Sequence, residues 1–213
     1  MGFIDLTIKE FLAQIDAPTP TPGGGSVAPI IIAHGISLIR MVAHLTVNKV
    51  KFKALPEDIQ NRYCDQFNQL AKLKDEVLLL SDEDSASYNK VVLAYRMPKD
   101  TLEDKEKRNQ QIALAITNAT EVPYQVLKLG MKVLTEALPM YEYANKTTLS
   151  DFGVGIKLIE AGMVSAKFNI DTNMRNFENR MVAKSYLNSS QLIIDKAFKI
   201  IEPILQKIND SFV

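Results

Sequence analysis

One carboxylate in this sequence stands where a core residue should be. Apolar and aromatic residues recur in steps of three and four along the segment from Pro56 to Arg96, as one face of a helix requires. Asp84 occupies that face between Leu80 and Tyr88. Burying an unpaired carboxylate is costly, so its position indicates either a partner or a chemical role in moving protons. The alternative is that the helix breaks near Ser81 and that Asp84 caps the next one.

A second candidate is the run from Asp16 to Ser26, which contains three prolines followed by Gly23, Gly24 and Gly25. The prolines favour a stiff extended backbone, and the glycines then permit a close approach to it. Ser26 is a suitable N-cap for the helix that follows. The free N–H groups at such a helix start can point at a ligand. The alternative is a sharp turn packed against the core.

Two further polar residues have ordinary explanations as well as functional ones. Asp151 follows Ser150, the expected N-cap of a later helix, where the helix dipole alone would stabilise an acid. Lys49 lies near the C-terminal end of the helix that follows the glycines, where a solvated lysine is common.

The sequence has two histidines, one cysteine, and no HExxH or CxxC motif. This composition argues against a zinc site, and we predict no metal ligands.

Most of the sequence has the spacing of apolar residues that is typical of helices, and these helices would position the residues described above. An all-α, single-domain antiparallel helical bundle over residues 1–213, with a central apolar helix, is the simplest organisation. Pro123 should kink or end the helix that contains it. The expected helices run over residues 7–15, 27–51, 56–96, from 101 to about 123, 122–145, 150–168 and from 180, with a polar stretch over residues 169–179.

Composition excludes several classes of protein. Apolar residues make up 46% of the 213 residues, enough for a sizeable core. Lys+Arg and Asp+Glu balance at 25 each, which gives no electrostatic case for nucleic acid or an anionic membrane. The most apolar run, Val27 to Ala33, is too short to span a bilayer. A single cysteine and an N-terminus without a signal-peptide pattern lead us to expect a cytoplasmic protein.

Several short blocks, in order along the chain, resemble the formiminotransferase-cyclodeaminase C-terminal family, which includes methenyltetrahydrofolate cyclohydrolases. The segment Thr19–Ala28 is similar to the family's Pro-Gly loop, and the segment from Met41 to Lys49 to the helix after it. The other similar blocks are Asp84 and Tyr88 with Ala94–Lys99, then Val122-Pro123, then Asn145 with Ser150-Asp151, and finally Asn169. Ala144, Ser165 and Lys167 stand where the family commonly has other residues.

The resemblance implies an all-helical bundle that forms homodimers and binds a tetrahydrofolate derivative, with no cofactor beyond that substrate. It implies that Asp84 or Asp151 transfers protons, with Lys49 or Lys99 near the pterin or the glutamate tail. It also implies that the substrate is held by the glycine loop and by polar side chains, namely Gly23, Gly24, Gly25, Ser26, Tyr88, Asn145, Ser150 and Asn169.

Two reactions remain open at this point. A cyclohydrolase adds water to 5,10-methenyltetrahydrofolate, and a cyclodeaminase closes 5-formiminotetrahydrofolate with release of ammonia. Both pass through a tetrahedral carbon bonded to nitrogens, and both need proton transfer beside a cationic carbon. A non-catalytic folate-binding module and a purely structural helical subunit are the alternatives from other classes.

Overall fold

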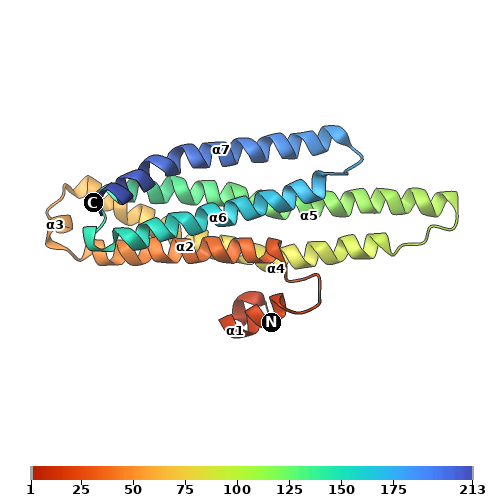
Figure 1. Cartoon of the computed structure of the whole chain (residues 1–213), viewed down its shortest axis with the longest axis horizontal. Helices are drawn as coiled ribbons and strands as arrows, with labels where there is room; N and C mark the ends of the chain where they lie inside the picture. The colour runs from red at the N-terminus through yellow and green to blue at the C-terminus, as the bar shows by residue number, and fades with distance from the viewer. Residues whose placement is uncertain (1, 213) are drawn as a thin grey trace.

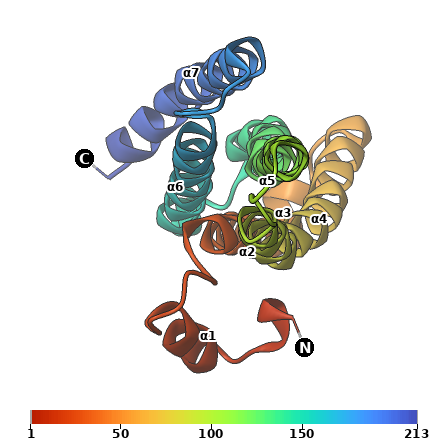
Figure 2. The same ribbon diagram turned by 90° about the vertical axis from the view of Figure 1, so that its right-hand side faces the viewer.

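The computed structural model describes residues 2–212, and these contain helices and no strand. Five long helices lie side by side along the longest axis of the molecule, and a short one lies apart from them near the N-terminus (Figures 1 and 2). The α-helices are α1 (Ile8–Ile15), α2 (Gly24–Val47), α3 (Val50–Lys53), α4 (Glu57–Tyr95), α5 (Leu102–Ala137), α6 (Leu149–Met174) and α7 (Arg180–Asp210). Short 3-10 helices are η1 (Phe3–Asp5), η2 (Leu138–Tyr143) and η3 (Lys146–Thr148).

Side-chain caps fix several helix starts, as the sequence predicts. The Glu10 N–H donates to Thr7 Oγ1 at 3.2 Å, and the Thr7 N–H donates back to Glu10 Oε2 at 2.8 Å, so α1 begins with a capping box. Thr101 and Asp104 form the same arrangement at the start of α5. These reciprocal bonds satisfy N–H groups that would otherwise lack a partner.

The central helix α2 begins earlier than the sequence suggests. Its N-cap is Gly23, which has extended dihedral angles, and the prediction of Ser26 as the N-cap is wrong. The Ser26 side chain instead points away from its own backbone toward α4. The helix ends at Val47 rather than near Lys51, because Lys49 adopts an extended conformation and starts α3.

Helix α4 runs unbroken through the position of Asp84, so a break near Ser81 is ruled out. Ser81 is fully buried, and its Oγ donates to the Ser26 carbonyl oxygen at 2.8 Å while its backbone stays helical. The predicted stripe on this helix faces the core, since Tyr63, Leu70 and Leu73 are almost completely buried. Asp84 therefore lies on an inward face.

Helix α5 also continues where a break was expected, at Pro123. Proline has no N–H to donate to the carbonyl of Ala119 four residues earlier. The Asn173 side chain of α6 supplies a donor instead, with Nδ2 3.4 Å from that oxygen. Because Val122, Val126 and their neighbours are buried on one continuous face, packing holds the helix together across the proline up to Ala137.

Helix α6 extends six residues beyond the predicted end at Phe168. Its apolar face continues through Ile170 and Met174, both fully buried, so the segment stays helical against the core. Asn169, expected in an irregular polar stretch, is thus on a helix. At the other end, the N-cap is Thr148, and Ser150 lies within the first turn rather than before it.

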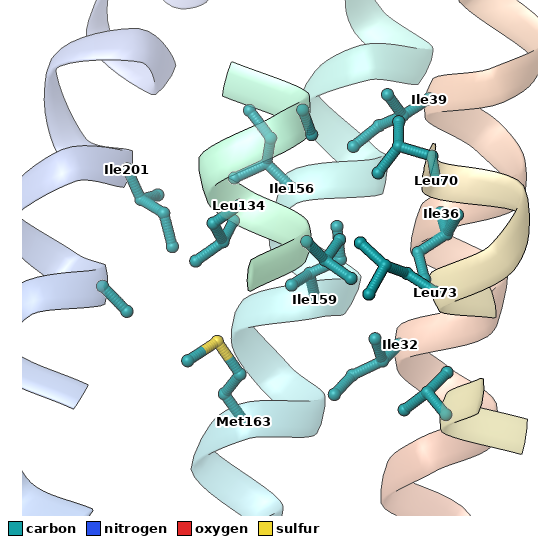
Figure 3. Packing of buried hydrophobic residues seen from close by; sticks show 14 of the residues in the cluster. Ile32, Ile36, Ile39, Leu70, Leu73, Leu134, Ile156, Ile159, Met163 and Ile201 are labelled. Carbon is teal, nitrogen blue, oxygen red and sulfur yellow. The ribbon is translucent and has the colours of Figure 1, made fainter. Parts of the chain in front are cut away.

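The core lies where α2 meets α4 and α6. Ile32, Ile36 and Ile39 of α2 project between the leucines of α4 and the isoleucines of α6 (Figure 3). The two backbones of α2 and α6 approach closely, because a Cβ placed on Gly35 would lie 2.5 Å from the Gly155 carbonyl oxygen. This close packing fixes α2 relative to α6.

By length and composition, α2 could also cross a membrane. An 18-residue window in it has a mean hydropathy of 1.7, and 44% of that window is buried inside the fold. The core helix of a soluble protein meets the same criterion. Here α2 is packed between α4 and α6, which gives the apolar residues on its inward face a protein environment.

Candidate functional site

A cleft of about 440 Å³ opens at the N-terminal end of α2. The Pro-Gly segment forms one wall, and α4, α5 and α6 form the others. Its lining includes six residues that the sequence predicts for the site, namely Gly23, Gly24, Gly25, Asp84, Tyr88 and Asn169. Segments far apart in the sequence therefore converge on one concave surface, as is usual for a small-molecule site.

Asp84 lies in the wall of this cleft and is held by a buried hydroxyl group. Ser26 Oγ donates to Asp84 Oδ2 at 3.0 Å and lies 3.1 Å from Ser85 Oγ, and Ser26 is completely buried. Burial raises the pKa of the Asp84 carboxyl, and the Ser26 hydrogen bond opposes this more weakly. A carboxyl with a raised pKa is better matched to proton transfer near neutral pH. Ser26 thus orients the carboxylate from behind.

Gly25 is the residue that lets Asp84 occupy this position. A Cβ built on Gly25 would lie 2.1 Å from Asp84 Oδ1, far inside van der Waals contact. Gly24 is different, since the nearest atom to its Cβ position is Asn169 Nδ2 at 3.9 Å. The carboxylate therefore packs directly against the first turn of α2, whose N-cap Gly23 supplies no side-chain hydrogen bond. Free N–H groups in that turn favour negative charge nearby.

A row of amide side chains on α6 and in the turn after it faces the same cleft. Asn169 donates through Nδ2 to the Ser165 carbonyl oxygen at 2.9 Å, and this bond sets the orientation of its amide. Asn173 and Asn176 follow it around the cleft wall. Sequence reasoning missed both. Asn173 stands four residues after Asn169 on the same helical face, so extending the predicted helix beyond Phe168 would have found it, whereas Asn176 lies in the turn after α6 ends at Met174.

Four other predicted residues lie at the opposite end of the bundle. Lys49 is the N-cap of α3, and the Asn145 N–H donates to Thr46 Oγ1 at the end of α2. Ser150 and Asp151 are in the first turn of α6. The helical rise places Asp151 about 27 Å along α6 from Asn169, and the two ends of α2 lie about 36 Å apart. Within one chain, this group does not share a ligand with Asp84.

Lys99 is also outside the cleft, in the loop that joins α4 to α5. Asn145 has a local structural role, because its Oδ1 accepts from the Thr147 N–H at 3.3 Å and caps η3. Asp151 lies where the helix dipole alone stabilises it. Asp84 is thus the one of the two predicted carboxylates that lines the cleft.

The cleft can attract a flat, polar and cationic molecule. Its carboxylate favours positive charge, its amides both donate and accept hydrogen bonds, and Tyr88 and Tyr95 supply aromatic surface. Within residues 2–212, no group of three or more His, Cys, Asp or Glu is placed to hold a metal ion. The groups at hand are therefore suited to proton transfer beside a bound cation.

The fold and the cleft together define an all-helical protein with a single-carboxylate site at the N-terminus of its central helix. The chain belongs to the formiminotransferase-cyclodeaminase family, whose family model matches residues 7–191. The family predicted from the sequence is therefore confirmed.

Individual relatives agree with this assignment. The chain is 30% identical over 205 residues to the methenyltetrahydrofolate cyclohydrolase of Methylorubrum extorquens, covering 96% of this chain and 97% of that protein. It is 28% identical to the formimidoyltransferase-cyclodeaminase of Gallus gallus, covering 90% of this chain but only 34% of that protein. The solved structure of the formiminotetrahydrofolate cyclodeaminase from Thermotoga maritima superposes with a TM-score of 0.79 at 22% identity, covering 95% of this chain and 97% of that one. This likeness confirms the all-α fold.

Proposed function

We propose that this protein is a methenyltetrahydrofolate cyclohydrolase or a formiminotetrahydrofolate cyclodeaminase, with Asp84 as its acid and base. The observation that carries the proposal is the carboxylate of Asp84, held by buried Ser26 in the wall of a cleft. Membership of the family supplies the substrate class. Hydrolysis is the first candidate, because the relative that matches over 97% of its own length is named as a cyclohydrolase.

In the hydrolytic reaction, Asp84 would move one proton. Its carboxylate accepts a proton from water as the water oxygen bonds to the cationic methenyl carbon. The protonated Asp84 then donates to N5 as the bond between that carbon and N5 breaks. The hydroxyl proton leaves as the formyl C=O forms, so the products are 10-formyltetrahydrofolate and one released proton.

In the cyclodeaminase reaction, the same group would serve the leaving nitrogen. The formimino group reacts in its protonated, cationic form, so that its nitrogen becomes an amino group when N10 bonds to the formimino carbon. The N10 proton is lost to the carboxylate, and protonated Asp84 donates it to the amino group, which departs as ammonia. Both reactions place positive charge beside the carboxylate, which stabilises it. The amide of Asn169 and the ring of Tyr88 would position the pterin, and the N–H groups after Gly23 would face its polar edge.

Turnover with the two substrates tests the proposal. The purified protein should remove the methenyl chromophore of 5,10-methenyltetrahydrofolate if it is a cyclohydrolase. It should generate that chromophore from 5-formiminotetrahydrofolate, with release of ammonia, if it is a cyclodeaminase. Absorbance measured against the spontaneous rate without protein decides between them. No acceleration with either substrate would refute both enzymes, and a folate-induced rise in melting temperature would then favour a binding module.

We propose further that the protein is a homodimer formed through α2. An apolar stripe on this helix, defined by Val27, Ile31, Leu38, Met41 and Leu45, stays partly or largely open to solvent, with Met41 37% and Leu45 44% exposed. The stripe carries no Asp, Glu, Lys or Arg that would repel its own copy. An antiparallel pairing of two α2 helices would cover it and would bring the Lys49 end of one copy toward the Gly24 end of the other.

The homodimer predicts a mass near twice 23.8 kDa in sedimentation equilibrium at micromolar concentration. Met41→Glu combined with Leu45→Glu should shift the protein to a monomer, because burying two carboxylates in an apolar interface is unfavourable. The matched control is Leu192→Glu, which changes an exposed leucine of α7. This helix lies apart from α2, with α6 between them (Figure 2). A monomeric wild-type protein, or a control that dissociates equally, would contradict the proposal.

A further inference from the structure

A second hollow adjoins the cleft around Asp84. It is lined, among others, by Arg108 and Ile112 of α5. The two share Tyr95, Ile116, Asn176 and Phe177, so they lie next to each other, and we refer to them together as the groove. The groove follows a single face of α4 from Asp84 through Tyr88 to Tyr95, a distance of about 16 Å along the helix.

The side chains that line this groove differ in charge and polarity from one end to the other. The inner part holds the carboxylate and the amides, and the middle is formed by Tyr95, Ile116 and Phe177. Among the described residues, the lining of the inner cleft includes no Lys or Arg. The outer part contains one cation, Arg108. An elongated ligand lying in the groove would therefore meet a negative group, then apolar surface, then a positive group.

Arg108 is held in place rather than freely mobile. Its Nε and Nη2 donate to the Tyr95 carbonyl oxygen at 3.3 and 3.1 Å, and its guanidinium carbon lies 5.6 Å from the centroid of the Tyr95 ring. The flanking lysines Lys105 and Lys107 are exposed, and Lys107 pairs with Glu103. A guanidinium has five N–H donors in a fixed plane, so donors remain for a carboxylate when two are used.

We propose that Arg108 binds the glutamate carboxylates of the folate substrate at the outer end of this groove. The inference rests on the proposed function, which places the cationic one-carbon unit at Asp84. The substrate then has its aromatic ring over Tyr95 and Ile116, and its acidic end beside Arg108. Within one chain neither Lys49 nor Lys99 lines the groove, so we assign the glutamate tail to Arg108 instead.

The experiment compares each folate with its pteroate counterpart, which lacks the glutamate. Arg108→Gln should raise KM for 5,10-methenyltetrahydrofolate roughly tenfold, since a charge-assisted bond is lost. It should leave KM for 5,10-methenyltetrahydropteroate and both kcat values unchanged. The matched control Lys107→Gln removes an exposed positive charge from the same helix and should alter neither KM. For a cyclodeaminase, the formimino compounds serve in the same way.

Glu178 provides a test of opposite sign. It lines the outer part of the groove, where its negative charge opposes an acidic ligand. Glu178→Gln should therefore lower KM for the folate severalfold and leave KM for the pteroate unchanged. An equal rise in KM for both substrates in Arg108→Gln, or no rise for either, would overturn the assignment.

The two proposals fail in distinguishable ways. If the wild-type protein turns over none of these compounds, the proposed function is wrong. The role of Arg108 is then decided by equilibrium binding of 5-formyltetrahydrofolate and 5-formyltetrahydropteroate. Preference for the folate that disappears in Arg108→Gln supports it, and absence of a preference or of binding refutes it.

Discussion

Asp84→Asn should lower turnover roughly 10²–10⁴-fold while the protein stays folded. The amide keeps the shape of the side chain and can still accept from Ser26 Oγ, which donates to Asp84 Oδ2 at 3.0 Å. It can neither take up a proton from water nor attract the cationic carbon. Initial rates at saturating substrate, together with circular dichroism to confirm helical content, measure the effect.

The matched control for this variant is Asp151→Asn. Asp151 was the other predicted carboxylate, and it lies in the first turn of α6 at the far end of the bundle from Asn169. Its loss should reduce turnover far less than Asp84→Asn does, because Asp151 does not line the cleft of its own chain. If Asp84→Asn retained full activity, or if Asp151→Asn were the inactive variant, the assignment of Asp84 would be wrong.

The raised pKa of Asp84 also predicts two pH dependences. As a base, Asp84 must be ionised, so kcat/KM should rise with pH through a pKa above 3.8, and Asp84→Asn should lack this limb. For stability, the folded state holds the proton more tightly than the unfolded state. The free energy of unfolding therefore falls as pH rises from about 3.8 through the folded pKa. Chemical denaturation at neutral pH should find Asp84→Asn at least as stable as wild type.

Gly25→Ala should reduce turnover roughly a hundredfold with a change in stability of no more than about 1 kcal/mol. The new methyl group would lie 2.1 Å from Asp84 Oδ1, so the carboxylate must move. A side-chain terminus can swing away at little cost, and alanine is a better helix former than glycine. The fold therefore tolerates the change while the carboxylate loses its position beside the substrate.

Gly24→Ala is a nearly identical substitution that should behave differently. The nearest atom to its added methyl group is Asn169 Nδ2 at 3.9 Å, an ordinary contact. We expect close to wild-type kcat, with any effect on KM below about threefold. Thermal melting and steady-state kinetics should be measured on both variants. A loss of turnover in Gly25→Ala alone would show that the carboxylate is displaced, rather than that any change in the glycine segment lowers activity. Equal losses in the two variants would show that Gly25 has no special role.

Much of the fold could be predicted from local signals. The capping pairs Thr7 with Glu10 and Thr101 with Asp104 place two helix starts correctly, because each bond depends on residues only three apart. The inward stripe of α4 was also predicted correctly from Tyr63 to Leu80, since periodicity over many turns is a strong signal, but beyond Asp84 its aromatic residues are exposed. Asp84 stood out for the same reason: a charged residue on an apolar face contradicts the pattern around it.

The predictions that failed depend on contacts between helices. Ser26 has the residue type of an N-cap, but the structure uses its hydroxyl to bind Asp84, 58 residues away. The end of α6 was placed too early because its asparagines look like loop residues, whereas buried Ile170 and Met174 keep the segment helical. The resemblance also names site residues at both ends of the bundle. Those at the Gly24 end line the cleft of this chain, and a role for those at the other end stays a prediction.

Pro123 shows how a local defect supports the cleft wall. The proline leaves the Ala119 carbonyl without its helical donor, and Asn173 of α6 donates to that oxygen across the interface. The chain thus forgoes one intrahelical bond, on the order of 1 kcal/mol, and gains an anchor for an asparagine that lines the cleft. Selection of this sequence for thermal stability alone would therefore replace Pro123 and free the Asn173 side chain from Ala119. The changes that make the bundle most stable would then differ from those that keep the cleft wall in place.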